Sequence, residues 1–142
     1  MRILLLNGPN LNLLGKREPE VYGTTDFQQF YEELAAVYDD VANFHYEQSN
    51  VEGELINILQ AADNDFDAVI FNAGGYTHTS VAIADCIAAI STPVVEVHIS
   101  QPAAREEFRH NSLIAGKCVA SISGFGLDSY RLAVEGLLAR ED

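Results

Sequence analysis

Short apolar runs alternate with amphipathic stretches along the 142 residues of this chain. The apolar runs predict buried strands at residues 2–6, 68–72, 93–99 and 118–122, with a weaker candidate at 43–48. The stretches between them predict helices at 26–38, from a cap at Ser49 or Asn50 through 62, at 79–90 and at 128–139, with a helical piece at 102–108. Strands that alternate with helices indicate a parallel sheet covered on both faces. We therefore expect residues 1–142 to form one α/β domain, a doubly wound, flavodoxin-like five-stranded sheet of strand order 2-1-3-4-5.

The charge balance narrows the choice of partners. The chain has 21 Asp and Glu against eight Lys and Arg, a formal net charge of −13. Nucleic acids and anionic membranes require a basic surface, so we expect neither as a partner. No apolar run reaches the length of a membrane span, and the expected location is cytoplasmic, with Cys86 and Cys118 as reduced thiols. A small anionic ligand is still possible where cations are placed locally, as at Arg105 and Arg109.

The segment that leaves the first strand holds much of the candidate chemistry. Residues 7–23 read NGPNLNLLGKREPEVYG and follow directly on an apolar run. A loop at the carboxyl end of such a strand is where an open α/β sheet usually binds its ligand. The glycines and proline around Arg17 and Tyr22 are typical of a mobile lid, which we place at about residues 15–24. A cation beside a phenol favours the phenolate, so such a lid could present Tyr22 as a base.

Polar residues also interrupt the predicted strand at 93–99. Side chains alternate between the faces of a strand, so Glu96, His98 and Ser100 share one face of the segment VVEVHIS. Buried polar groups need partners, because an unpaired one costs a few kcal/mol. One interpretation is a satisfied structural network. The other is a histidine prepared for proton transfer and oriented by a carboxylate.

The strand at 68–72 ends in a similar polar segment, NAGGYTH. Its two glycines would allow a ligand to approach the backbone, and Asn72 offers an amide at the strand end. The alternative is a tight turn in which Thr77 or Thr79 caps the next helix, and the two interpretations are compatible. Taken alone, His78 is typical of a surface histidine.

Other charged residues are ambiguous when read one at a time. Asp85 is typical of an exposed helix carboxylate, and Arg105 could be a solvated cation. Arg109, between Phe108 and His110, suits a partly buried anchor. The four histidines and two cysteines lack metal-ligand spacing, and neither G-x-G-x-x-G nor a Walker A motif occurs, so the sequence implies no metal and no nucleotide cofactor.

Four long motifs occur in order: LNGPNLNLLGKREPEVYG at 6–23, QSNVEGELI at 48–56, NAGGYTHTSVAIADC at 72–86 and PVVEVHISQPAAREEFRHNS at 93–112. Together they make the chain resemble the type II 3-dehydroquinate dehydratases of the shikimate pathway. The resemblance runs from the first strand to about Ser112 and continues more weakly to the C-terminus. It implies a cofactor-free anti elimination of water from 3-dehydroquinate to 3-dehydroshikimate through an enolate. No Schiff-base lysine is needed under this interpretation.

The resemblance also implies roles for residues that match the family motifs. Tyr22 matches the base, and Arg17 matches the lid arginine that lowers its pKa from the ordinary value near about 10. Asn10 matches the residue that stabilises the enolate oxygen with a water. His98 matches the general acid, and Glu96 the carboxylate that orients it.

The remaining matches concern substrate binding and assembly. The clamp on the substrate carboxylate matches Asn72 and the backbone N–H groups of Ile99 and Ser100. The groups that bind the ring hydroxyls match His78 and Arg109. Asp85 matches a residue that reaches in from a neighbouring subunit. The family implies a homo-oligomer, a dodecamer built as a tetramer of trimers. The sequence departs from the family pattern at Gln101, at Gly75 and, in the C-terminal stretch, at Ser121, Asp128 and Ser129.

Two other functional classes stay open at this stage. A flavin-binding module would need a Ser/Thr-rich loop after the first strand, where this chain has NGPN. A receiver domain would need an Asp at the end of the strand at 68–72, where this chain has Asn72. Beyond these two classes, the chain could be a catalytically silent relative used as a scaffold. The intact set of matched site residues argues against that.

Overall fold

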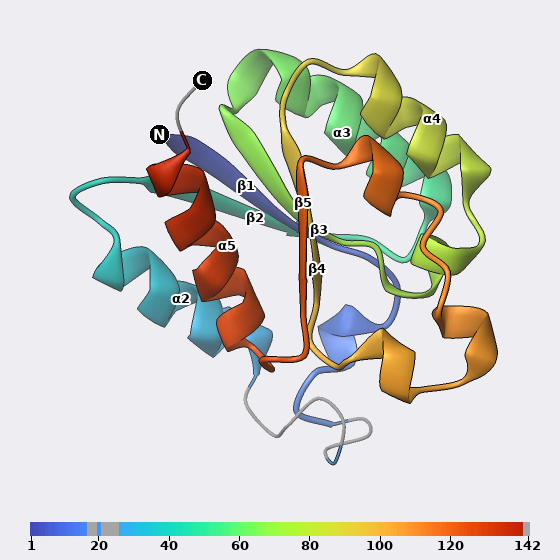
Figure 1. Cartoon of the computed structure of the whole chain (residues 1–142). Helices are drawn as coiled ribbons and strands as arrows, with labels where there is room; N and C mark the ends of the chain where they lie inside the picture. The colour runs from blue at the N-terminus through green and yellow to red at the C-terminus, as the bar shows by residue number, and fades with distance from the viewer. Residues whose placement is uncertain (17–19, 21–25, 141–142) are drawn as a thin grey trace.

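The computed structural model describes residues 1–16, 20 and 26–140 (Figure 1). Arg17 and Tyr22 lie outside the described residues, as does most of the segment expected to form a lid. The structural statements that follow concern the described residues.

The strands form one parallel sheet. They are β1 (Arg2–Asn7), β2 (Asn43–Gln48), β3 (Ala68–Asn72), β4 (Val94–His98) and β5 (Ala120–Ser123), in the order β2-β1-β3-β4-β5. The predicted fold class and strand order are therefore confirmed. β1 and β3 pair along their length, so Asn7 and Asn72 lie opposite each other at their carboxyl ends.

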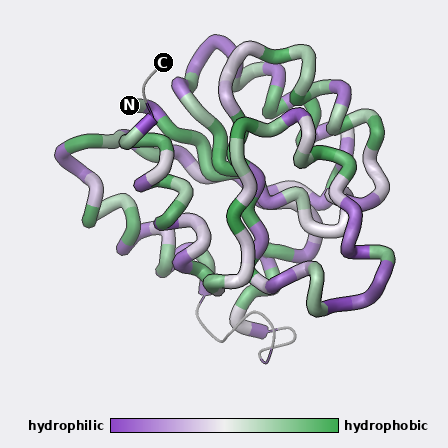
Figure 2. The backbone as a smooth tube through the Cα atoms, in the orientation of Figure 1, coloured by the Kyte–Doolittle hydropathy of each residue, from purple (hydrophilic) through white to green (hydrophobic). Residues whose placement is uncertain are grey.

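Helices cover both faces of this sheet (Figure 1). α2 (Phe27–Val37) and α5 (Asp128–Ala139) pack on one face, and α3 (Glu52–Asp65) and α4 (Val81–Ala89) on the other. β1 is apolar from Ile3 to Leu6 and β3 from Ala68 to Phe71 (Figure 2), because both faces of these strands are buried, whereas β4 contains the polar Glu96 and His98. Each fully buried Leu or Ile side chain stabilises the fold by about 1.5–3 kcal/mol. None of the described helices has the length and apolar character needed to cross a bilayer.

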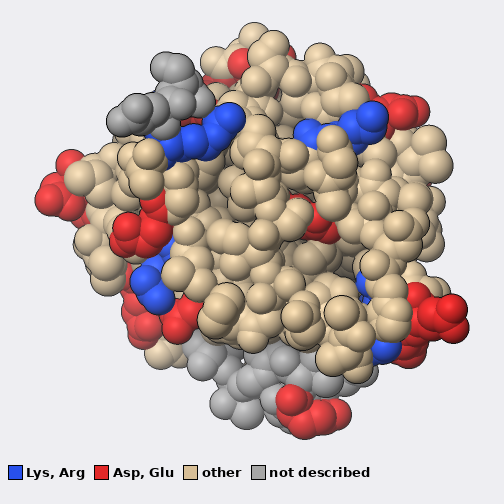
Figure 3. Space-filling view, viewed as in Figure 1, with Lys and Arg blue, Asp and Glu red and all other residues tan. Residues whose placement is uncertain are grey.

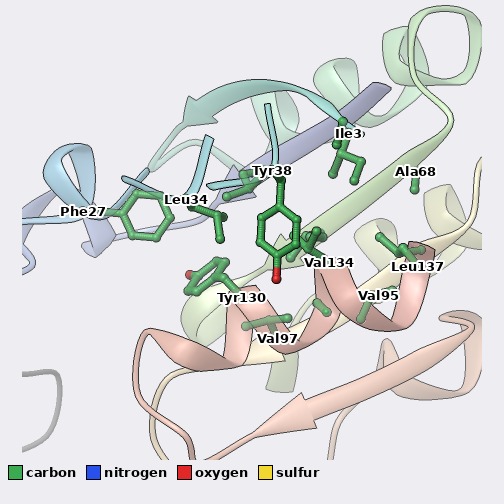
Figure 4. Packing of buried hydrophobic residues seen from close by; sticks show 14 of the residues in the cluster. Ile3, Phe27, Leu34, Tyr38, Ala68, Val95, Val97, Tyr130, Val134 and Leu137 are labelled. Atoms are coloured by element: carbon green, nitrogen blue, oxygen red, sulfur yellow. The ribbon is translucent and has the colours of Figure 1, made fainter. Parts of the chain in front are cut away.

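An aromatic cluster joins α2 and α5 above the sheet (Figure 4). The Phe27 ring centroid lies 4.9 Å from that of Tyr130 and 4.8 Å from that of Tyr46. Tyr130 is completely buried. Edge-on and tilted aromatic pairs of this kind add about 0.5–1.5 kcal/mol beyond the area that they bury. The cluster fixes the first turn of α5 near the carboxyl ends of β1 and β3.

The predicted cap of α4 is wrong. Neither Thr77 nor Thr79 caps the helix, because the chain first forms the 3-10 turn η2 (Gly74–His78). Ser80 occupies the N-cap, and its Oγ accepts a hydrogen bond from the backbone N–H of Ile83 at 2.9 Å. The 3-10 turn moves the first helical residue along the chain, and the hydroxyl that is then in place forms the cap.

The predicted cap of α3 is also wrong. Val51 occupies the N-cap position and makes no side-chain cap bond. Ser49 Oγ accepts from the N–H of Val51 at 3.0 Å, in the turn that precedes the helix. Asn50 Oδ1 instead accepts from the backbone N–H of Asn10 at 3.0 Å and from Gln48 Nε2 at 3.1 Å. Its side chain therefore holds the loop after β1 and is not free to cap.

The region between β4 and β5 is less regular than the sequence predicts. The expected helical piece at 102–108 consists of two 3-10 turns, η3 (Pro102–Ala104) and η4 (Glu107–Arg109). A third turn, η5 (Ala115–Lys117), delays the start of β5 to Ala120. The short turns let this segment fold over the carboxyl end of β4.

Candidate active site

A cleft opens at the carboxyl ends of β1, β3 and β4. It is lined by Pro9, Asn10 and Leu11 after β1, by Asn72, Gly74, Gly75 and His78 after β3, and by His98, Ile99, Ser100, Pro102, Arg105 and Arg109 of β4 and its following turns. Seven residues expected in the site thus share one cleft: Asn10, Asn72, His78, His98, Ile99, Ser100 and Arg109. This is the topological switch point of the sheet, where β1 and β3 lead to connections on opposite faces.

Glu96 and His98 form a buried pair on β4. His98 Nε2 lies 2.7 Å from Glu96 Oε2, and the two side chains are 13% and 2% exposed. The alternation of side chains along the strand places both on the same face, as expected. The pair therefore presents an imidazole to the cleft with a carboxylate behind it.

Two serines complete the surroundings of Glu96. Ser121 Oγ donates to Glu96 Oε1 and Ser112 Oγ donates to Glu96 Oε2, each at 2.7 Å. Burial alone would raise the pKa of Glu96, but hydrogen bonds from His98, Ser121 and Ser112 outweigh it and hold that pKa below its usual value. Glu96 is thus a carboxylate anion near neutral pH despite its burial.

Cys118 lies near the same carboxylate. Burial, aided by the charge of Glu96, raises the pKa of the Cys118 thiol to about 12. Cys118 therefore adds no charge beside Glu96, and it is a free thiol, as is Cys86.

Asn10 begins the turn at the edge of the cleft in a left-handed conformation, with φ of 69°. Asparagine tolerates this region better than most residues, because its short side chain can bond locally. The N–H of Asn10 donates to Asn50 Oδ1, and Gln48 Nε2 donates to the carbonyl of Gly8 at 3.1 Å. Polar side chains at and beyond the end of β2 thus hold the loop that carries Asn10.

Gly8 and Gly74 let the loops after β1 and β3 approach closely. The N–H of Gly8 donates to the carbonyl of Asn72 at 2.7 Å, and a Cβ on Gly8 would lie only 2.6 Å from the carbonyl oxygen of Ala73. Gly74 has a φ of +60°. Because only glycine fits the contact at Gly8 and favours the conformation at Gly74, the segments NGPN and NAGG serve backbone packing as well as the cleft.

Asn72 is fixed by bonds on both ends of its amide. Its Oδ1 accepts from the N–H of Gly74 at 3.1 Å, and its Nδ2 donates to the hydroxyl of Tyr130 at 2.9 Å. The side chain is 3% exposed and lines the floor of the cleft. Its orientation is therefore set before any ligand binds.

Two arginines give the cleft local positive character, and His78 lines it with them. The rings of His78 and His98 are stacked with centroids 6.4 Å apart, and His78 Nδ1 lies 2.9 Å from the carbonyl of Asn111. Arg105 Nη1 donates to Ser100 Oγ at 3.3 Å, and Arg109 is partly buried, as expected of an anchor. The described Lys and Arg side chains are scattered over the face that Figure 3 shows, whereas Arg105 and Arg109 both line the cleft and so place two cations together there.

Four predicted site residues are absent from the described lining of the cleft, and one of them, Glu96, lies buried behind His98. Asp85 is exposed on α4 and does not line it. Arg17 and Tyr22 fall outside the described residues, so their predicted roles stay predictions. In the part of the chain that is described, no three His, Cys, Asp or Glu side chains gather as metal ligands would.

Sequence reasoning missed several residues that support the site. They are Gln48, Asn50, Tyr130, Ser112 and Ser121. The sequence singles out Ser121 only as a departure from the family pattern. The available signal is Tyr130 on the buried face of α5, because a buried phenol oxygen needs a hydrogen-bond partner.

Comparisons with known proteins agree with this architecture. Residues 1–138 match the family described as Dehydroquinase class II. A 3-dehydroquinate dehydratase from Exiguobacterium sp. is 54% identical over 97% of this chain and 94% of its own length, and one from Prochlorococcus marinus is 46% identical over 98% and 97%. The crystal structure of type II dehydroquinase from Butyrivibrio crossotus superposes with a TM-score of 0.94 at 39% identity, over 98% of both chains.

Proposed function

Because the chain belongs to the class II dehydroquinase family, and is thus a 3-dehydroquinate dehydratase and a hydro-lyase, we propose that it removes water by anti elimination through an enolate. Tyr22 is the base and His98 the general acid in this proposal. The observation that carries it is the Glu96–His98 pair, in which the buried Glu96 carboxylate lies behind the His98 ring that lines the cleft. Membership of this family favours an enzyme of the shikimate pathway over a flavin-binding or receiver module.

The acid role of His98 follows from the pairing of its ring. With Glu96 ionised, the Nε2–H of His98 donates to Glu96 Oε2 at 2.7 Å, so Nδ1 is the nitrogen left for the substrate. The Glu96 anion stabilises an imidazolium, which can then give its proton to the departing hydroxyl. After the step, Glu96 holds the neutral ring in one tautomer, prepared for reprotonation.

The base role rests on the family resemblance. Tyr22 would remove the proton beside the ketone, and Arg17 would lower the pKa of its phenol. We place both in a lid at about residues 15–24. Asn10, at the edge of the cleft, would stabilise the enolate oxygen through a water.

Substrate binding uses donors already arranged in the cleft. The carboxylate of 3-dehydroquinate would lie against the Asn72 amide and the backbone N–H groups of Ile99 and Ser100. His78 and Arg109 would bind ring hydroxyls. These groups are neutral or cationic donors, which suits an anionic polyol and requires no added cofactor.

The direct test is turnover of 3-dehydroquinate, followed by the enone absorbance of 3-dehydroshikimate without added metal or cofactor. We expect turnover by the wild type, and Tyr22→Phe and Arg17→Ala should each reduce kcat by about a hundredfold or more. Lys16→Ala is the control, since it removes a neighbouring cation with no assigned role. A folded protein without turnover would refute the proposal, and wild-type rates in either variant would remove that residue's role.

We also propose that the chain assembles as a dodecamer, a tetramer of trimers, in which Asp85 reaches the site of a neighbouring subunit. Asp85 is exposed on α4 and lies outside the cleft of its own chain, and the nearby Val81 is 63% exposed. Light scattering should give twelve chains per particle. Asp85→Ala should lower activity while the particle mass stays the same, and a fully active monomer would contradict this proposal.

A further inference from the structure

The Glu96 carboxylate is held by three donors that come from three parts of the chain. His98 and Ser112 contact Oε2, and Ser121 donates to Oε1, all at 2.7 Å. A carboxylate held at one oxygen alone can rotate about its terminal bond. Donors on both oxygens remove this freedom.

Each serine is itself fixed by the backbone. Ser121 lies directly opposite Glu96 in the β4–β5 register, so its hydroxyl reaches across one strand spacing. Ser112 lies before η5, and its Oγ accepts from the N–H of Ala115 at 3.0 Å while it donates to Glu96. Neither hydroxyl needs to reorganise in order to hold the carboxylate.

We propose that Ser121 and Ser112 are positioning residues, whose hydroxyls hold both oxygens of the Glu96 carboxylate and keep it aimed at His98. The inference rests on the proposed function of His98 as the general acid. Neither serine touches the substrate in this arrangement, and both act through Glu96.

Other titratable groups face the pair from neighbouring elements. His78 in η2 stacks on His98, and Cys118 precedes β5 with its thiol protonated near neutral pH. Arg105 and Arg109 line the same cleft from the turns after β4. None of these groups is among the described hydrogen-bond partners of either serine, so we expect them to stay in place in the serine variants, and a change at Glu96 can then be assigned to the lost hydrogen bond.

The first test follows the Glu96 carboxyl by ¹³C NMR as the pH is lowered, which requires no turnover. Ser121→Ala removes a donor to the anion, so the titration of Glu96 should move to higher pH by about one unit, and further in Ser112→Ala/Ser121→Ala. Ser121→Thr keeps the hydroxyl and should restore the wild-type titration. Ser123→Ala is the matched control, because its hydroxyl lies on the same strand but donates to Gln101 at 2.9 Å.

The second test measures kinetics with 3-dehydroquinate in the same variants. In Ser121→Ala we expect kcat to fall several-fold with KM within about twofold, and the acidic limb of the pH–kcat profile to move to higher pH. Because Ser121 is on an exposed edge strand, this variant should fold. If Glu96 titrates at the wild-type pH in both Ser121→Ala and the double variant, the inference is wrong. If the wild type does not turn over while the NMR shift occurs, the proposed function fails and the placement of Glu96 stands.

Discussion

The hydroxyl of Tyr130 accepts a hydrogen bond of 2.9 Å from the side-chain amide of Asn72, although the two residues come from α5 and the end of β3. The same hydroxyl donates to Asn7 Oδ1 at 2.7 Å, at the end of β1. One buried phenol thus joins the ends of the two strands that flank the switch point. Burial, as the largest effect, raises the pKa of Tyr130 far above the usual range, so it remains a neutral donor.

Tyr130→Phe should weaken both the fold and the cleft. The substitution removes the partner of two buried atoms, Asn72 Nδ2 and Asn7 Oδ1, and we expect the free energy of unfolding to fall by about 2 kcal/mol. Asn72 would lose its fixed orientation, so KM for 3-dehydroquinate should rise more than kcat falls. Urea unfolding and steady-state kinetics measure the two effects.

Tyr38→Phe is the matched control for that experiment. The Tyr38 hydroxyl donates to Glu135 of α5 at 2.6 Å, in the same helix layer but away from the cleft. The variant should lose less stability and keep the wild-type KM. An equal rise of KM in both variants would show that Tyr130 acts only through general packing.

Gly8→Ala should destabilise the protein, because the added Cβ would meet the backbone carbonyl of Ala73 at 2.6 Å. Neither strand end can move without disturbing the sheet, so we expect a loss of about 1–3 kcal/mol in the free energy of unfolding. Gly75→Ala is the control, since nothing lies within 4 Å of its added Cβ. Thermal or urea unfolding measures the stability of both variants, and equal stability would contradict the predicted clash at Gly8.

The fold was predictable because each strand carries its own signal. The apolar run of β1 and the alternation in β4 both reflect burial, which acts on every residue of the element. Element ends were harder to predict. Ser49, Asn50, Thr77 and Thr79 all have capping side chains. For α4 the cap depends on where the preceding 3-10 turn stops, and for α3 Asn50 is already bonded to Asn10 and Gln48, so packing decides both cases.

The site was predictable only where its residues lie close together in the sequence. Glu96 and His98 are two residues apart on one strand, so the alternation alone places them on one face. Tyr130 and Asn7 are 123 positions apart, and only the packing of α5 on the sheet brings them together. Ser121 likewise reaches Glu96 through the register of β5, which no local pattern specifies.

Asp63→Asn should make the stability of the protein less dependent on pH. Hydrogen bonds from the side chain and backbone of Thr92, and from the backbone of Ser91, hold the pKa of Asp63 below its usual value. When the pKa is lower in the folded state, the carboxylate stabilises the fold at pH values above its unfolded-state pKa of about 3.9. This contribution is lost as the pH falls through the folded-state pKa. The variant should therefore be less stable than the wild type at pH 7 and approach it in strong acid. Urea unfolding across this range is the measurement, with Asp65→Asn on the same helix as the control.

Glu96→Gln should separate the charge of Glu96 from its shape. The amide has the size of the carboxylate but no negative charge, so it cannot stabilise a protonated His98. We expect kcat to fall by about a hundredfold with a much smaller change in KM, because the loss concerns proton transfer and not substrate binding. Glu47→Gln on β2 is the matched control, since Glu47 is absent from the lining of the cleft. Steady-state kinetics over a range of pH measure both variants. A wild-type kcat in Glu96→Gln would show that His98 does not need the negative charge of Glu96 to act as the general acid.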